Sequence, residues 1–126
     1  MPHTTVSVYR DADGSVPLET WLSVLEKRVP KAYDRALERI LQLESYGNEL
    51  KMPHSKPLGD GIYELRWRVV KVQYRILYFF HGKCAAALSD GFTKEGAVPP
   101  HEIELAIKRK KLIVANPNKH LAEFDL

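Results

Sequence analysis

Two consecutive segments in the middle of the chain alternate between apolar and charged residues, which predicts two β-strands around residues 63–69 and 73–80. Because successive side chains of a strand point to opposite faces, each segment gives one set to the core and one to the other face. The predicted core sets are Tyr63, Leu65, Trp67 and Val69, then Tyr74, Ile76, Tyr78 and Phe80. The opposite sets are Glu64, Arg66 and Arg68, then Gln73, Arg75, Leu77 and Phe79. We interpret the charged face as a working surface.

If the two strands form a hairpin that turns at residues 70–71, Arg66 lies directly opposite Arg75. Like charges facing each other destabilise a sheet by up to roughly 1 kcal/mol, so the pair indicates an anion site, with phosphate as the natural candidate. The turn itself is a valine and a lysine, neither of which favours the positive φ of a two-residue turn, so this register is a hypothesis. The alternative is that both arginines are structural, paired with Glu64 or Asp90.

Two amphipathic helices are predicted before the strand pair. The first follows a short strand over residues 4–10 and has Ser15 as N-cap and Pro17 in its first turn. The second begins after Pro30 and ends at residues 47–48, where Gly-Asn is a typical C-terminal stop. Their apolar faces are Leu18, Trp21, Leu22, Leu25 and Val29, then Tyr33, Ala36, Leu37, Ile40 and Leu41.

Residues 48–60 are rich in turn formers, and a strand of small residues is predicted over 84–92 after the strand pair. A last helix opens at residues 99–102 and ends at 116–117, and the tail from Asn118 is expected to fray. The apolar residues of this helix are Ile103, Ala106, Ile107, Ile113 and Val114. The predicted order is β-α-α-β-β-β-α, an α+β fold with a helical hairpin and a C-terminal helix on one face of a mostly antiparallel sheet. At 126 residues, the chain is expected to form a single domain over 1–126.

Composition narrows the class of protein. Cys84 is the only cysteine, which excludes an intramolecular disulfide and a cysteine-based zinc cluster. No secretion signal or membrane-spanning run is apparent, so a cytoplasmic protein is expected. Residues 1–50 carry six Lys/Arg and eight Asp/Glu, whereas residues 51–94 carry eight Lys/Arg and three Asp/Glu. The basic charge therefore belongs to the predicted sheet, as in proteins that meet nucleic acid or an acidic partner.

Four stretches of this sequence resemble the signature of phage-derived HigB-like toxins of the RelE/ParE superfamily. They are Lys56-Pro-Leu-Gly-Asp-Gly-Ile-Tyr-Glu-Leu-Arg66, Tyr74-Arg-Ile-Leu-Tyr78, Asp90-Gly-Phe-Thr-Lys94 and residues 99–106. The resemblance implies a RelE-like fold and the toxin of a bacterial type II toxin-antitoxin pair. Such a toxin cleaves messenger RNA on the ribosome without metal or cofactor and is silenced by a helix-turn-helix, HigA-like antitoxin. One departure is Glu95, where the family commonly has a second lysine, and this reduces the positive charge.

RNA is cut when its 2′-hydroxyl attacks the adjacent phosphate, so a protein catalyst must align the attack, move protons and stabilise added negative charge. Arg66 and Arg75 are the predicted phosphate clamp, because a guanidinium stays charged and grips two oxygens at once. Lys94 is expected to join them or to act on the leaving 5′-oxygen. The predicted RNA-binding residues are His54, Lys56 and Arg68, of which the first two are also candidates for acid/base work. For His54 and Arg68 the alternative is an ordinary solvated side chain.

Two other functions are also compatible with the sequence. The same scaffold serves ParE-like toxins that inhibit DNA gyrase without catalysis, since fold does not determine function. A degenerate module that only binds an antitoxin is a third reading, which Glu95 keeps open. The run of four basic residues at 108–111 is suited to ribosomal RNA or to the solvated face of a helix.

Overall fold

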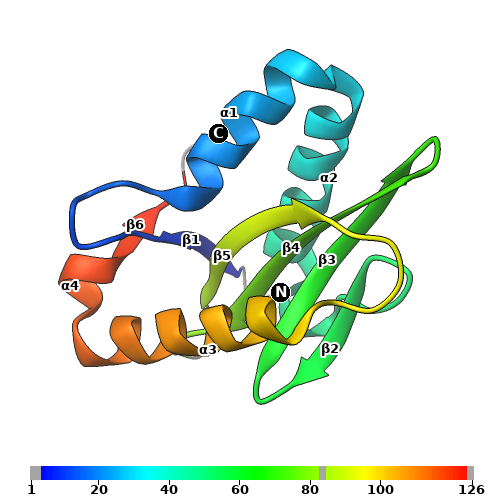
Figure 1. The fold of residues 1–126 in the computed structure, drawn as a ribbon. Coiled ribbons are helices and arrows are strands. Elements are labelled where there is room, and N and C mark those ends of the chain that lie inside the picture. Colours follow the sequence, from blue (N-terminus) through cyan, green and yellow to red (C-terminus); the bar gives the residue numbers. More distant parts are fainter. Residues whose placement is uncertain (1–3, 83–84, 125–126) are drawn as a thin grey trace.

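The computed structural model describes residues 4–82 and 85–124, and within them six strands form one sheet in the order β2-β3-β4-β5-β1-β6 (Figure 1). The strands are β1 (Thr5–Tyr9), β2 (Ser55–Gly59), β3 (Ile62–Val69), β4 (Val72–Phe80), β5 (Ala85–Thr93) and β6 (Leu121–Glu123). Neighbouring strands are antiparallel except β1 and β5, which run parallel. The predicted α+β class with a mostly antiparallel sheet is confirmed. The strand of small residues predicted over 84–92 was expected to begin at Cys84, which lies outside the described residues.

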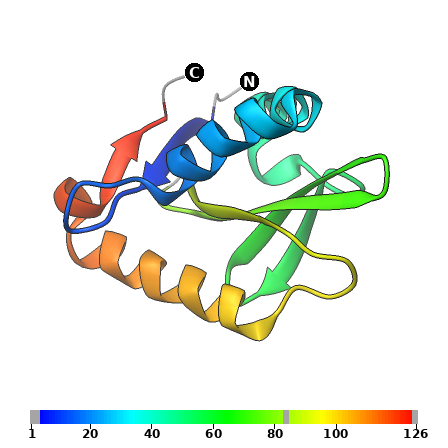
Figure 2. The same ribbon diagram turned by 45° about the horizontal axis from the view of Figure 1, so that its top comes forward.

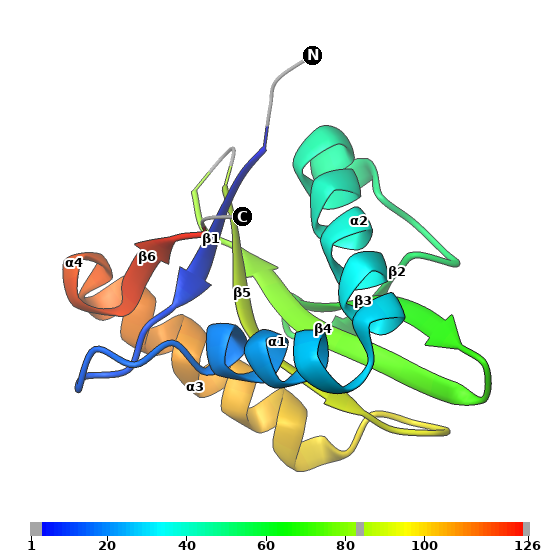
Figure 3. The same ribbon diagram turned by 90° about the horizontal axis from the view of Figure 1, so that it is seen from above.

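Helices cover both faces of the sheet. Within the described residues they are α1 (Pro17–Arg28), α2 (Pro30–Tyr46), the 3₁₀ turn η1 (Gly47–Glu49), α3 (Pro100–Ala115) and α4 (Pro117–His120). α1 lies over β5 and α2 over β3 on one face (Figure 3), whereas α3 packs against the opposite face (Figure 2). The prediction that the helices share one face is therefore wrong. None of the helices in the described ranges is long and apolar enough to cross a lipid bilayer.

β4 shows why two helical layers are needed. The side chains of residues 76–79 are all nearly inaccessible to solvent, although they alternate between the two faces. Ile76 and Tyr78 pack under the α1–α2 hairpin, and Leu77 and Phe79 pack under α3. An uninterrupted apolar run of this kind is typical of a strand that is buried on both sides. The charged side chains of the predicted working surface are therefore accessible to solvent only toward the far end of the hairpin, at Arg66 and Arg68.

The β3–β4 hairpin has the predicted register. Arg66 lies opposite Arg75, and Val69 pairs with Val72 across a turn at residues 70–71. Val70 has a φ of 56°, a conformation that β-branched residues rarely adopt, and its side chain is 86% exposed. The poor turn sequence is accommodated by local backbone strain at a tip that extends beyond the helices (Figure 1).

The start of α1 differs from the prediction. Val16 occupies the N-cap position and makes no side-chain capping bond. The Ser15 hydroxyl instead donates to Asp13 Oδ1 at 2.7 Å, so Ser15 closes the preceding turn. Pro17 then begins the helix with a φ that is already suited to it. The predicted end of α2 is confirmed by Gly47, which adopts a φ of 56° at the C-cap.

β2 is missing from the predicted order. Lys56 and Pro57 interrupt any apolar alternation there, which is why the segment looks like a loop. Proline, which has no backbone N–H to donate, is tolerated in β2 because this strand is at the edge of the sheet. Asp60 and Gly61 form the turn into β3 with φ values of 55° and 78°, as a two-residue hairpin turn requires.

The C-terminal segment is folded through residue 124, so the prediction that it frays from Asn118 is wrong. β6 pairs with β1 in antiparallel orientation and extends the sheet. The Arg10 guanidinium fastens α4 by donating to the carbonyls of Asn118 and Lys119 at 2.7 and 3.0 Å. A strand of three residues is too short to leave a periodic pattern in the sequence.

α3 is rotated relative to the predicted apolar face. Val114 is 63% exposed, whereas Arg109 from the basic run is buried. The Arg109 guanidinium lies 4.9 Å from the centre of the Tyr9 ring, and Nη1 donates to Ser89 Oγ at 3.1 Å. Arg109 is therefore a structural residue, and only the lysines at 108, 110 and 111 remain for other roles.

Candidate nucleic-acid interface

A hollow with a basic lining lies at the outer edge of β3, near the end of the hairpin. Its walls come from α2, the loop before β2, β3 and β4, and its volume is about 350 Å³. The lining residues are Arg39, Met52, Pro53, His54, Arg66, Trp67, Arg68 and Gln73. We term this site the basic hollow. Three arginines and a histidine line it, and none of these described residues carries a carboxylate, so the hollow is suited to an anion.

The basic hollow exists because β2 covers only part of β3. Strand pairing reaches as far as Ser55 and Leu65, and the next N–H, that of Arg66, donates to the His54 carbonyl at 2.9 Å. Arg39 Nε on α2 donates to the Arg66 carbonyl at 2.9 Å. A loop carbonyl and a helix side chain therefore satisfy the edge of β3 in place of another strand. His54 and Arg66 are brought together as a result.

Glu64 lies between the two arginines that were predicted to clamp a phosphate. Its Oε2 is 2.6 Å from Arg75 Nη1, and its Oε1 is 3.4 Å from Arg66 Nε. Arg75 also donates to the carbonyls of Lys94 at 3.1 Å and Gly96 at 2.5 Å. With all three of its nitrogens engaged and only 4% of its surface exposed, Arg75 is not accessible to a ligand in this conformation. The alternative of pairing with Glu64 is confirmed for both arginines.

Arg66 nevertheless remains accessible from the basic hollow. Its Nη1 faces Met52 Sδ at 3.2 Å, and a thioether is a weak acceptor. Its Nε is buried and forms no hydrogen bond within the described part of the chain, because the contact with Glu64 is an ion pair of poor hydrogen-bond geometry. A phosphate oxygen would be a better acceptor for Arg66 than the sulfur is.

Arg68 at the rim of the basic hollow is held by Glu95. The two side chains form a forked pair with N–O distances of 3.1 and 3.4 Å, and Glu95 also accepts the Gln73 backbone N–H at 3.1 Å. The hydrogen bonds from Arg68 lower the pKa of the Glu95 carboxyl, with smaller contributions from Gln73 and the Arg75 charge. Glu95 thus neutralises one of the three arginines around the hollow.

His54 has the properties of a proton acceptor. Burial lowers the pKa of its imidazole, and the positive charge of Arg39 lowers it further. Its Nδ1 atom is buried and has no hydrogen-bond partner among the residues that the structure describes. A neutral imidazole next to arginines that attract a phosphate is a suitable general base.

Three of the six predicted site residues, Arg75, Lys56 and Lys94, do not line the basic hollow, and one of the charged residues that do line it was not predicted. Lys56 is exposed on β2 opposite Glu64, and Lys94 is exposed after β5, where its N–H donates to the Gln73 carbonyl. Arg39 is the residue that sequence reasoning missed. The helical spacing of the sequence could have identified Arg39, because it falls three residues after Ala36 and four before Leu43, on the buried face of α2.

Comparison with known proteins gives two findings. The sequence pattern of the family described as Phage derived protein Gp49-like (DUF891) matches residues 20–111. Two relatives described as "Probable endoribonuclease HigB1" come from Mycobacterium tuberculosis, strains CDC 1551 / Oshkosh and ATCC 25618 / H37Rv. Each is 30% identical to this chain over 91 residues, which is 71% of this chain and 73% of the relative. The matched family region includes Arg39 and every lining residue of the basic hollow.

Proposed function

Since this chain belongs to the family of phage-derived Gp49-like proteins, we propose that it is the toxin of a type II toxin-antitoxin pair and a cytoplasmic endoribonuclease that cleaves messenger RNA on the ribosome. The observation that carries the proposal is the gathering of His54 and Arg66 in one basic hollow on the rim of the sheet. The name of the Mycobacterium tuberculosis relatives supports the same class of reaction.

In the proposed mechanism the RNA backbone lies across the basic hollow with its scissile phosphate at Arg66. His54 accepts the proton of the 2′-hydroxyl as it attacks the phosphorus, and the 5′-oxygen leaves with a proton from a donor such as Lys94. Arg66 stabilises the additional negative charge on the phosphate oxygens, which is the largest electrostatic demand of the reaction. Arg68 and Lys56 hold the flanking backbone. This chemistry requires no metal ion or cofactor, because the nucleophile and the leaving group both belong to the RNA.

Arg75 has a different part in this proposal from the one the sequence predicted. Arg75 forms a buried ion pair with Glu64. Glu64 in turn forms an ion pair with Arg66 Nε and so holds Arg66 at the wall of the basic hollow. The bonds of Arg75 to the Lys94 and Gly96 carbonyls also fix the loop that carries Glu95. Arg75 is thus a positioning residue, and Arg66 is the group that contacts the phosphate.

The rate of cleavage should depend on the protonation of His54. Because the pKa of His54 is lowered from the usual histidine value of 6.5, more than half of the imidazole is still neutral at pH 6.5, and the larger part of its protonation occurs at lower pH. Cleavage should therefore be retained at pH 6.5 and decline at lower pH, and His54→Gln should remove this acid limb together with most of the rate. The pH profile of single-turnover cleavage checks this. An acid limb centred above pH 6.5, or one that persists in His54→Gln, would assign the base to another group.

Replacing Glu95 with glutamine should strengthen RNA binding. The change keeps the size of the side chain but removes the charge that neutralises Arg68, so one more cation faces the phosphates. Because an exposed ion pair is weak, the dissociation constant should fall only modestly, by up to about fivefold. The slope of log K against log salt should also steepen by up to about one phosphate contact. Glu104→Gln, an exposed acid on α3, is the matched control; unchanged binding in Glu95→Gln would mean that Arg68 is not used by RNA.

Primer extension on a reporter transcript after brief expression tests the proposed function directly. Discrete cuts inside translated codons are the expected result, and their disappearance when translation is blocked would show dependence on the ribosome. Loss of DNA supercoiling without cuts would indicate a gyrase inhibitor instead. Normal growth with no cuts would indicate a degenerate module that only binds its partner.

The expected partner is a helix-turn-helix antitoxin of the HigA-like type. Its reading frame is expected beside that of the toxin, and the two proteins should purify as a complex when they are produced together. Expression of the antitoxin should abolish the cuts seen by primer extension.

A further inference from the structure

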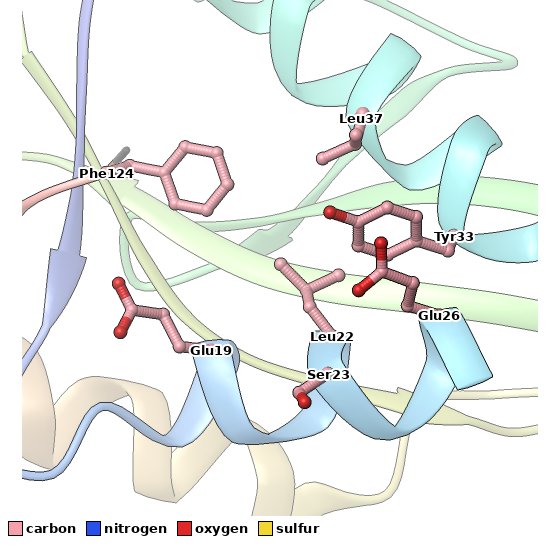
Figure 4. Close-up of a pocket in the computed structure, with 7 residues that line it drawn as sticks. All are labelled: Glu19, Leu22, Ser23, Glu26, Tyr33, Leu37 and Phe124. Carbon is pink, nitrogen blue, oxygen red and sulfur yellow. The ribbon is translucent and has the colours of Figure 1, made fainter. Parts of the chain in front are cut away.

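A second hollow differs from the basic hollow in charge and location. It lies between the helical hairpin and the segment after β6, and its volume is about 170 Å³. The lining residues are Glu19, Leu22, Ser23 and Glu26 of α1, Tyr33 and Leu37 of α2, and Phe124 (Figure 4). We term it the hairpin groove.

The floor and far wall of the hairpin groove are apolar. Leu22 rises from α1, and Leu37 and the Phe124 ring approach it from two other segments (Figure 4). Leu41, one helical turn after Leu37 on α2, continues the apolar surface and is 46% exposed. A cavity of this size, open on one side, is suited to one large apolar side chain.

Carboxylates stand at the two ends of the hairpin groove. Glu19 and Glu26 are seven residues apart on α1, which places them about 10 Å apart on one helical face. Neither forms an ion pair or a hydrogen bond within the described residues, and no Lys or Arg lines the groove. Two unpaired negative charges around an apolar floor repel RNA and favour a cationic, partly apolar partner.

We propose that the hairpin groove binds a helix of a partner protein in which a large apolar residue lies between two basic residues seven positions apart. Such a helix, packed along α1, places its apolar side chain on Leu22 and Leu37 and its two cations at Glu19 and Glu26. This inference rests on the proposed function in one respect, namely that the partner is the antitoxin. The antitoxin then binds the helical hairpin rather than the basic hollow.

The test uses a pair of helical peptides made of alanine and glutamine with leucines at the centre. One peptide carries two lysines seven residues apart on either side of the leucines, and the other carries glutamates at the same two positions. Titration of the ¹⁵N-labelled protein with the lysine peptide should move the amide signals of Leu22, Tyr33 and Leu37 in a saturable manner. Binding of the glutamate peptide should be about tenfold weaker or more, because two attractive contacts become repulsive.

Charge reversal in the protein makes the test specific to the two carboxylates. The double variant Glu19→Lys and Glu26→Lys should reverse the preference and bind the glutamate peptide more tightly. Glu49→Lys, an exposed acid on η1 outside the groove, should leave the preference unchanged. The proposal is overturned if the lysine peptide causes no saturable shift at the groove, or if the double variant keeps the original preference.

A cellular measurement separates this proposal from the proposed function. The double variant should cleave messenger RNA like the wild type but escape neutralisation by the protein of the adjacent reading frame. Neutralisation at the wild-type level would show that the antitoxin does not use the groove. If the wild type cleaves no RNA, the proposed function fails, and the peptide titration alone decides whether the groove is a helix-binding site.

Discussion

Arg66→Ala should lower the rate of messenger RNA cleavage by about 10²- to 10³-fold while leaving the protein folded. Arg66 is the arginine that reaches the basic hollow, and removal of one preorganised charge at a reacting group typically has an effect of this size. Glu64 keeps its stronger contact with Arg75, so the substitution leaves no buried carboxylate without a partner. Single-turnover cleavage of a labelled transcript on purified ribosomes measures the rate.

Two further variants make the Arg66 result interpretable. Arg66→Lys should give an intermediate rate, since a lysine keeps the charge but cannot bind two phosphate oxygens in a planar fork. Arg35→Ala should have no effect, because Arg35 is an exposed arginine on α2 that pairs only with Glu38 at 3.6 Å within the described residues. Cleavage by Arg66→Ala within threefold of the wild type, at saturating RNA, would remove Arg66 from the mechanism.

The hairpin could be derived from the sequence down to single residue pairs. Alternation has a period of two, so the apolar set of β3 can face the core in only one phase. This phase leaves registers that differ by two residues, and the assumed turn at residues 70–71 selects the one in which Arg66 lies opposite Arg75, which the structure confirms. The strain at Val70 is the result, because burial of two complete strand faces outweighs the cost of one poor turn.

The errors arise where long-range contacts decide the structure. β2 and β6 are short edge strands that form because a neighbour offers unpaired backbone groups, and their own sequences show no strand period. Arg109 is buried because Tyr9 and Ser89, both far away in the sequence, supply its partners. A basic run on a helix does not reveal which member will find such partners.

The sequence predicted which types of residue form the candidate site but not which of them are buried and which are accessible. Three of the predicted residues, His54, Arg66 and Arg68, do line one hollow. The burial of Arg75 depends on the carbonyls of Lys94 and Gly96, which come from a loop whose path the local sequence does not determine.

Arg75→Met should destabilise the fold more than any change at the surface of the site. It removes the main partner of Glu64 and leaves an inaccessible carboxylate without its closest ion pair, a change that costs about 3–5 kcal/mol. For a chain of this length the unfolding midpoint should fall by roughly 10–20 °C. Arg68→Met, which breaks the exposed pair with Glu95, should lower the unfolding midpoint far less, because exposed ion pairs contribute little to stability, and it is the matched control. Thermal and urea unfolding measure both changes.

A double-mutant cycle identifies the cause of the Arg75 effect. The loss of stability in Arg75→Met can arise from the buried Glu64 carboxylate that is left without its partner. In that case Arg75→Met combined with Glu64→Leu should be more stable than Arg75→Met alone, because an apolar pair replaces the buried charges. Additive losses would instead assign the effect to lost packing and to the bonds with Lys94 and Gly96. Cleavage should be measured below the unfolding midpoint of Arg75→Met. A wild-type cleavage rate at such a temperature would show that the reaction needs neither contact of Arg75 with phosphate nor positioning of Arg66 by Arg75. A lower cleavage rate together with weaker RNA binding would support the positioning of Arg66 by Arg75 through Glu64.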